Sequence, residues 1–185
     1  MTYLPQLLFF FAISSAFLGI SWKPLHNPRC HGFYRFFAFE GILVLVLFNF
    51  PFWFAHPFAP LQILSWSCLF CSILFVVRGL YDLRTAGGSG NRETAPENFA
   101  FENTVHLVRS GIFGYIRHPM YSSLLLLAWG AFLKHTSAVA LVVIVFTTFM
   151  LTIAARIEER ENLAFFGSAY QDYMRVTRKF FPFLY

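Results

Sequence analysis

The chain has 185 residues, of which 57% are hydrophobic, 21% aromatic and only 12% charged, with a formal net charge of +5. A soluble domain carries about 25% charged residues, so this composition excludes a water-covered surface and indicates one domain, 1–185, whose solvent is the bilayer. The basic residues flank apolar segments, so membrane topology explains the positive charge and we expect no nucleic-acid partner.

Five apolar segments predict an all-α, polytopic membrane protein with about five transmembrane helices. A helical span needs about 20 apolar residues, and the candidates in chain order are 4–20, 36–54, 61–77, 120–133 and 139–155. The first lacks the flanks of a cleavable signal peptide, so we expect 1–20 to be retained. The fourth is short, so we expect a tilted or partly re-entrant helix covered by its neighbours. Continuous apolar runs argue against a β-barrel.

Polar segments follow the third and the fifth of these spans. The segment 81–118 is predicted to be a cytoplasmic loop, and within it Gly87-Gly88-Ser89-Gly90 is typical of a flexible connection. The residues after 155 are charged and amphipathic, so we expect a C-terminal cytoplasmic amphipathic helix with a break at Gly167. The chain thus divides into three N-terminal spans (1–80), the loop (81–118) and a C-terminal part (119–185).

The distribution of Lys and Arg predicts the orientation. The loops after the first, third and fifth spans are rich in Arg and Lys, whereas the second loop has none and the fourth has only Lys134. Positively charged loops face the cytoplasm, so we expect the N-terminus outside and the C-terminus in the cytoplasm. The small size and this orientation favour a prokaryotic inner membrane.

The three cysteines do not predict a disulfide framework, because three cannot all pair within one chain. Cys68 and Cys71 form a C-x-x-C inside an apolar run that has no His or carboxylate beside them. Two small buried thiols on one helix face are therefore favoured over a metal or redox site, and we expect no metal.

Polar residues crowd the start of the fourth span, in the segment Leu107-Val-Arg-Ser-Gly-Ile-Phe-Gly-Tyr-Ile-Arg-His-Pro-Met-Tyr121. Pro119 suits the first turn of a helix, which puts Arg117 and His118 at a helix N-terminus, where amide groups and the helix dipole favour an anion. The segment predicts a carboxylate or phosphate site. An interfacial anchor, with Arg117 reaching headgroups and Tyr121 in an aromatic belt, explains it equally well.

Two adjacent acids, Glu158 and Glu159, follow the fifth span, where a cytoplasmic helix end would favour bases. Acids beside an apolar span are usually paired or functional, and these two are candidates to accept hydrogen bonds from ribose hydroxyls or an ammonium group. A charged helix with internal ion pairs is the alternative. Farther along, Tyr170 and Tyr173 share a helix face, most simply for packing or an interface.

The segments 107–121 and 158–173, followed by a basic stretch and Pro182, resemble the signature of the isoprenylcysteine carboxyl methyltransferase and phospholipid methyltransferase superfamily. Two motifs in the right order, separated by one apolar hairpin, are far more specific than either motif alone. The resemblance covers roughly Val105 to Leu184, whereas the N-terminal spans are similar only in hydropathy.

The resemblance implies S-adenosylmethionine as methyl donor, bound in a helical membrane fold near the cytoplasmic face. It implies a lipophilic or membrane-associated acceptor that enters from the bilayer: a prenylcysteine carboxylate, a phospholipid amine or a thiol. Carried over residue by residue, it gives catalytic or cofactor-binding roles to Arg117, His118, Glu158 and Glu159. Further cofactor contacts are implied for Leu107, Gly111, Tyr115, Pro119 and Tyr121. Only an amine acceptor would need a base, taken from His118, Glu158 or Glu159.

Two other functions compete with methyl transfer. A membrane sterol-type reductase that uses NADPH has a similar C-terminal pattern of acids, Gly, Tyr and Pro, but does not characteristically carry the Arg-His-Pro-Met-Tyr segment. A non-enzymatic transport or structural membrane protein would explain the hydropathy but not two ordered motifs. Charged or strongly polar residues within the spans would mark a transport path, and only Glu40 and Asn49 qualify.

Overall fold

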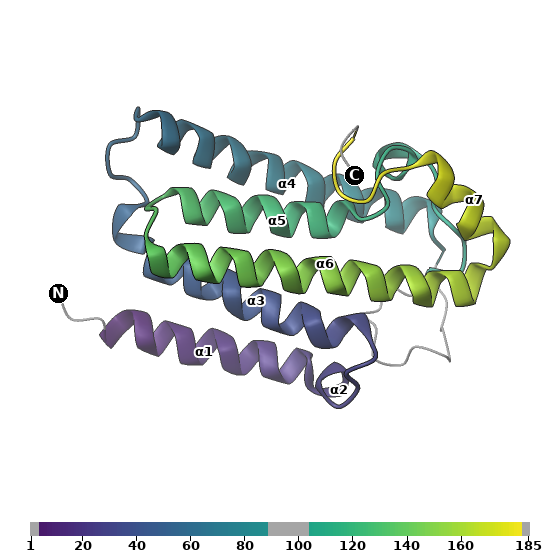
Figure 1. The fold of residues 1–185 in the computed structure, drawn as a ribbon, viewed down its shortest axis with the longest axis horizontal. Helices are drawn as coiled ribbons and strands as arrows, with labels where there is room; N and C mark the ends of the chain where they lie inside the picture. Colours follow the sequence, from purple (N-terminus) through teal and green to yellow (C-terminus); the bar gives the residue numbers. More distant parts are fainter. Residues whose placement is uncertain (1–3, 89–103, 183–185) are drawn as a thin grey trace.

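The computed structural model describes residues 4–88 and 104–182, and within these ranges every regular element is helical (Figure 1). The helices are α1 (Leu4–Ile20), α2 (Trp22–Leu25), α3 (His31–Phe48), α4 (Pro60–Ala86), α5 (Pro119–Leu133), α6 (Ala138–Phe166) and α7 (Ser168–Val176), with short 3₁₀ turns η1 (Phe50–Phe52) and η2 (Gly111–Gly114). The all-α prediction is confirmed for these ranges. The flexible connection predicted at 87–90 runs into residues 89 and 90, which lie outside the described residues.

Five helices lie side by side with alternating direction: α1, α3, α4, α5 and α6 (Figure 1). The closest pairs are α4 with α5 and α3 with α6, while α1 packs on the outside of α3. Small residues let the backbones approach: a Cβ atom added at Gly41 of α3 would lie 2.1 Å from Oγ1 of Thr147 in α6. The core between α3, α5 and α6 is completed by buried apolar residues: Ile42, Leu45, Leu125, Ala128, Ile144 and Leu151.

Three of the described helices, α3, α4 and α6, are long and apolar enough to cross a membrane. Helices α1 and α5 are also apolar but have only 17 and 15 residues. Large apolar side chains on the outer faces of α4 and α6 are more than half exposed, as expected of surfaces that face lipid: Phe70, Ile73, Val142 and Phe149. The short α5 is covered by α3, α4 and α6, which is how a short span is tolerated. The count of five spans stays a prediction.

The helix bounds differ from the predicted spans at both ends of the bundle. Helix α3 ends at Phe48 rather than 54, because Asn49 donates through Nδ2 to the Ala131 carbonyl at 2.9 Å and Pro51 follows. Helix α4 continues past 77 to Ala86, so the predicted loop 81–118 begins as helix. Helix α6 continues past 155 to Phe166 and ends at Gly167, as the predicted break requires. These polar extensions of α4 and α6 form walls of the candidate site.

Candidate active site

The two sequence motifs meet at one end of the bundle, where α4 and α6 end and α5 begins (Figure 1). Helix α5 begins at Pro119, with His118 as its N-cap, as the sequence predicts. Because α5 and α6 form an antiparallel hairpin, the start of α5 and the end of α6 lie on the same side. Helix α7 and the segment after it fold back over this end.

The segment after α7, which we call the C-terminal segment, is bound to the chain just before α5 by backbone hydrogen bonds. The N–H of Arg117 donates to the Arg178 carbonyl at 2.8 Å, and the N–H of His118 donates to the Lys179 carbonyl at 3.1 Å. In return the N–H of Arg178 donates to the Tyr115 carbonyl at 3.0 Å. This pairing fixes the backbone of both segments and brings Lys179 to the acids of α6.

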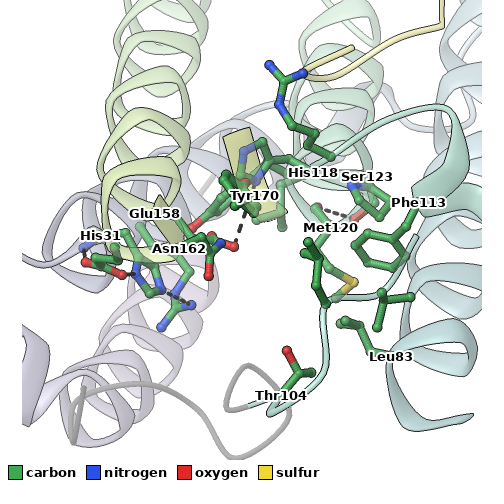
Figure 2. A pocket seen from close by; sticks show the side chains of 18 of the residues that line it. His31, Leu83, Thr104, Phe113, His118, Met120, Ser123, Glu158, Asn162 and Tyr170 are labelled. Carbon is green, nitrogen blue, oxygen red and sulfur yellow. Dashed lines mark hydrogen bonds and ion pairs between the residues drawn. The ribbon is translucent and has the colours of Figure 1, made fainter. Parts of the chain in front are cut away.

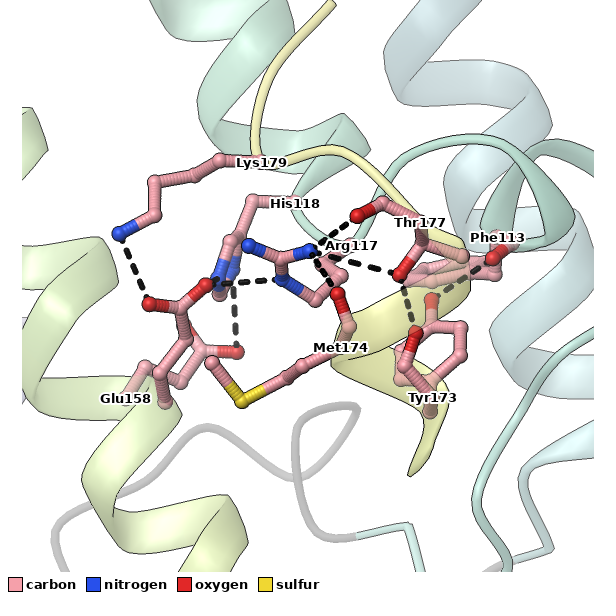
Figure 3. A network of polar contacts seen from close by, with 9 residues as sticks. Phe113, Arg117, His118, Glu158, Tyr173, Met174, Thr177 and Lys179 are labelled. Carbon is pink, nitrogen blue, oxygen red and sulfur yellow. Dashed lines mark hydrogen bonds and ion pairs between the residues drawn. The ribbon is translucent and has the colours of Figure 1, made fainter. Parts of the chain in front are cut away.

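Glu159 lies at the centre of a buried ionic cluster that we call the closed network, made of Glu159, Arg117, His118 and Lys179. Figure 3 shows its three basic members, Arg117, His118 and Lys179. One carboxylate oxygen is 2.9 Å from Nε of Arg117 and 3.4 Å from Nε2 of His118. The other is 2.8 Å from Nζ of Lys179. The Glu159 side chain is only 8% exposed. Three basic side chains therefore surround this one carboxylate.

The Nη1 group of Arg117 binds the backbone of α7 and of the segment after it. Its Nη1 donates to the Met174 carbonyl at 3.2 Å and to the Thr177 carbonyl (Figure 3). Burial would raise the pKa of Glu159, but hydrogen bonds and charge from His118, with hydrogen bonds from Lys179 and Arg117, outweigh it and lower the pKa to about 2. Glu159 is therefore ionised at neutral pH and clamps the C-terminal segment onto α6.

Next to the closed network lies a cavity of about 190 Å³, walled by α3 to α7 and by the segment 104–113. Figure 2 shows His31, Glu158 and Asn162 on one side, facing Leu83, Phe113 and Met120 on the other. The side formed by α3 and α6 is polar, and the side formed by α4, α5 and the turn η2 is largely apolar. The cavity thus offers carboxylate and amide groups opposite an apolar wall.

Six of the residues predicted from the motifs line this cavity: Leu107, Arg117, His118, Pro119, Tyr121 and Glu158. Of the paired acids, Glu158 faces it with its side chain 28% exposed, and one of its oxygens is 3.8 Å from Nδ1 of His118. Glu159 is turned away into the closed network. The two adjacent acids therefore lie in different surroundings, Glu158 at the cavity and Glu159 in the closed network.

Gly111 and Tyr115, two predicted cofactor contacts, are not among the residues that line the cavity. Gly111 has a φ of +60°, and a Cβ atom there would lie 2.0 Å from Oδ2 of Asp82. That oxygen accepts a hydrogen bond from the N–H of Ile112 at 2.8 Å, which attaches η2 to α4. Tyr115 is 68% exposed. The glycine thus serves the close approach of η2 to α4.

Four polar residues that α3 and α6 contribute to the cavity wall were not predicted as site residues: His31 and Arg35 on α3, and Glu161 and Asn162 on α6. The sequence does contain a signal for the last two, because they lie three and four positions after Glu158 and so share its helix face. His31 and Arg35 look in the sequence like polar residues that flank a span. Their place in the cavity depends on the packing of α3 against α6.

Tyr170 and Tyr173, predicted to share a face of a C-terminal helix, both lie on the buried face of α7 and line the cavity. Burial raises the pKa of each phenol well above its ordinary value, so both stay neutral. Tyr173 donates from its hydroxyl to the Phe113 carbonyl at 2.7 Å (Figure 3). This bond links α7 to η2 across the cavity.

One known protein family matches the part of the chain that contains most of this site. The family model described as phospholipid methyltransferase matches residues 61–169, which is more than half of the chain. The chain belongs to the phospholipid methyltransferase family. This family is part of the isoprenylcysteine and phospholipid methyltransferase superfamily, so the resemblance seen in the motifs is confirmed.

The matched region runs from the start of α4 into α7. It therefore contains the first motif, residues 158–169 of the second and the acids of α6, and it makes the chain a methyltransferase by family, with membrane lipids as the type of substrate. Helices α1 to α3 and the segment after α7 lie outside the match. No curated protein and no solved structure matches the chain.

Proposed function

We propose that the protein transfers a methyl group from S-adenosylmethionine to a lipophilic, membrane-associated acceptor, and that the donor binds in the cavity. The observation that carries this proposal is the cavity itself. It joins Glu158 and Asn162 of the second motif to His118 and Tyr121 of the first motif, inside the family-matched region. Methyl transfer is general for the family, and the cavity is where its two motifs have a common surface.

The residues present fit the chemistry of this donor. A ribose diol and an ammonium group need carboxylate and amide acceptors, which Glu158 and Asn162 offer from adjacent turns of α6. An adenine ring and a sulfonium cation suit apolar and aromatic walls, which Phe113, Phe166 and Tyr170 provide. When bound, the donor supplies an electrophilic methyl group on a positively charged sulfur.

The chain's own contribution is then mainly to bind, orient and exclude water. The carboxylate of Glu158 orients the polar end of the donor, and the buried hydroxyl of Tyr173 fixes η2 as the opposite wall. The apolar wall of Leu83, Phe113 and Met120 keeps water from the reacting groups. Alignment of donor and acceptor in one enclosed volume lowers the entropic cost of an in-line displacement.

Proton handling depends on the acceptor. A carboxylate or thiolate attacks without a base, whereas an ammonium group must first lose a proton. Glu158 Oε1 and His118 Nδ1 are 3.8 Å apart, and both residues line the cavity. An amine proton would pass to one of these two atoms. We do not assign this role to Glu159, because it lies in the closed network and its pKa is lowered to about 2.

The cavity is proposed to lie at the cytoplasmic side of the membrane. The site end of the bundle carries basic residues of the first, third and fifth polar segments, among them Lys23, Arg84 and Arg156, whereas the opposite end has Lys134. The side with more Lys and Arg faces the cytoplasm. S-adenosylmethionine would then reach the cavity from the cytoplasm, and the acceptor from the bilayer.

The test is methyl transfer from labelled S-adenosylmethionine into lipid, measured with the purified protein in vesicles. Leu107 lines the cavity, and Leu107→Trp is expected to fill it and abolish transfer. Tyr115→Trp, at an exposed position outside the cavity, is the matched control and should keep wild-type transfer. Equal transfer by both variants would overturn the assignment to this cavity. Stabilisation by NADPH instead of S-adenosylmethionine would favour the reductase.

A further inference from the structure

A groove of about 330 Å³ lies on the outer face of the bundle, between α5 and α6, which run side by side (Figure 1). Helix α5 contributes Trp129 to it, and none of the residues that line this groove lines the cavity of the candidate active site. The remaining lining residues all come from α6: Val145, Thr148, Phe149, Thr152, Ile153 and Arg156. The groove is therefore a second candidate binding surface, separate from the proposed donor site.

The groove is apolar over most of its length. Val145, Phe149 and Ile153 follow one another at intervals of four residues and form a row along α6, and the first two are each 58% exposed. Thr148 and Thr152 form the neighbouring row and are less exposed. The hydroxyl of Thr148 is covered, and that of Thr152 donates to the Thr148 carbonyl at 2.8 Å. Small side chains beside large ones thus leave a hollow with little free polar surface, which suits a hydrocarbon chain.

The groove ends at an arginine whose charge is not neutralised by the described part of the chain. Arg156 is exposed, and no ion pair or hydrogen bond joins its side chain to another residue within 4–88 or 104–182. The same holds for Arg160, which lies one turn later on the same helix face. Glu159, the acid nearest to both in the sequence on this side of α6, is held in the closed network. Two like charges one turn apart repel each other, so an anion bound beside them is favoured.

The length of α6 places this arginine at the depth of lipid headgroups. Helix α6 is long and apolar enough to cross a membrane, and it rises about 27 Å from Ala138 to Arg156, close to the ~30 Å of a bilayer's hydrocarbon core. The groove itself, from Val145 to Arg156, extends about 16 Å along the helix, which is close to the hydrocarbon thickness of one leaflet. A phosphate beside Arg156 therefore leaves an acyl chain of the same molecule lying along the groove.

We propose that the groove binds one anionic phospholipid of the surrounding membrane, with its phosphate at Arg156 and Arg160 and one acyl chain along Val145, Phe149 and Ile153. The two arginines select an anionic headgroup over a zwitterionic one, because they repel the ammonium of the latter. This site does not depend on the proposed methyl transfer. The bound lipid holds the part of α6 that carries Glu158, two positions after Arg156, at the membrane surface.

The experiment uses Trp129 in the groove as a fluorescent reporter. The full chain is reconstituted into vesicles of dioleoyl phosphatidylcholine and dioleoyl phosphatidylglycerol, in which only one of the two lipids carries brominated chains that quench tryptophan. The chain has four tryptophans, so the signal of Trp129 is taken as the difference between the wild type and Trp129→Phe. Brominated phosphatidylglycerol should quench Trp129 with an apparent affinity at least about fivefold above that of brominated phosphatidylcholine, the factor expected from one arginine at an anionic lipid.

Three variants separate the groove from general surface charge and from misfolding. Arg156→Gln should remove most of the preference for phosphatidylglycerol and leave quenching by brominated phosphatidylcholine unchanged, which shows that the groove is still formed. Arg156→Lys keeps the charge and should retain most of the preference. Arg84→Gln removes an exposed arginine of α4 at the same end of the bundle, outside the groove, and should retain all of it.

Three results would overturn the proposal. Equal quenching of Trp129 by the two lipids would mean that the groove does not select an anion. Loss of the preference in Arg84→Gln as complete as in Arg156→Gln would assign it to the charge of the whole surface. Failure of both lipids to quench Trp129 would mean that protein, such as a second copy of the chain, covers the groove. The readout involves no methyl transfer, so its outcome is independent of the proposed function.

Discussion

Glu158 and Glu159 are neighbours in α6, yet they belong to two regions of the molecule with opposite character. Glu159 lies in the closed network, with Arg117, His118 and Lys179 within 3.4 Å of its oxygens. Glu158 faces the cavity and is 28% exposed, with His118 Nδ1 at 3.8 Å. The carboxylate of Glu159 is bound by side chains of the protein, whereas the carboxylate of Glu158 has room for a ligand. One turn of helix therefore carries both a structural clamp and a candidate binding group.

The difference shows that an acidic pair in a sequence motif need not act as a pair. Both carboxylates would suit a ribose or an ammonium group by chemistry alone. What separates them is the C-terminal segment, which brings Lys179 to Glu159 and gives Arg117 its carbonyl partners. We therefore expect a change at Glu159 to alter mainly stability, and a change at Glu158 to alter mainly binding.

The largest effect is expected for Glu159→Gln. This change leaves Arg117 and Lys179 buried without their carboxylate, which costs about 3–5 kcal/mol in comparable buried pairs. Thermal unfolding in detergent should show a fall in Tm of several degrees. Glu158→Gln is the matched control at the adjacent position and should leave the Tm of the ligand-free protein nearly unchanged. Similar losses in both variants would mean that the two regions are not distinct.

The closed network also predicts how stability depends on pH. The pKa of Glu159 is lowered from 4.5 to about 2 in the folded protein, so its stabilising contribution is complete above pH 4.5. It is lost as the pH falls toward 2, and amounts to about 3 kcal/mol. His118, Arg117 and Lys179 face the same carboxylate. Denaturant unfolding between pH 5 and pH 2 should be less pH-dependent in Glu159→Gln than in the wild type.

A smaller loss of stability is expected for Gly111→Ala, which tests whether this glycine belongs to the scaffold. The positive φ and the added Cβ atom, 2.0 Å from Asp82, together disfavour alanine by about 2 kcal/mol. Gly114→Ala, in the same turn and without a positive φ, should cost much less. If Gly111→Ala keeps its Tm and loses only cofactor affinity, the glycine contacts the ligand after all.

The smallest effect is expected for Tyr115→Ala. This residue belongs to the first motif, but its side chain is 68% exposed and it is not among the residues that line the cavity. Affinity for S-adenosylhomocysteine, measured by calorimetry, should change by less than about twofold. A tenfold loss would show that Tyr115 contacts the ligand outside the cavity.

The sequence predicted those features of the fold that depend on nearby residues. Pro119 marks the start of α5 and Gly167 the end of α6, because each is a strong local signal. The polar extension of α4 to Ala86 was not predicted, because polar residues after an apolar run look like a loop. In α4 they remain helical, supported by the ion pair of Arg78 with Asp82 at 3.2 Å, four positions apart.

The division of roles within the site could not be predicted, because it depends on long-range contacts. His31 and Glu161 are 130 positions apart in the chain, and their contact at 2.6 Å is what orders this side of the cavity. Likewise, Glu159 is enclosed by Arg117 and His118 from before α5 and by Lys179 from beyond α7, which folds back onto α6. Motif spacing identifies the acids, but not the partners that the fold brings to each.

The central claim is that the cavity beside Glu158 binds the methyl donor. Its most direct test is calorimetric titration of S-adenosylhomocysteine into the detergent-purified wild type and into Glu158→Gln. We predict saturable binding by the wild type, and an affinity at least tenfold lower for the variant at an unchanged Tm. No binding by a folded wild type, or equal affinity in both proteins, would contradict the account.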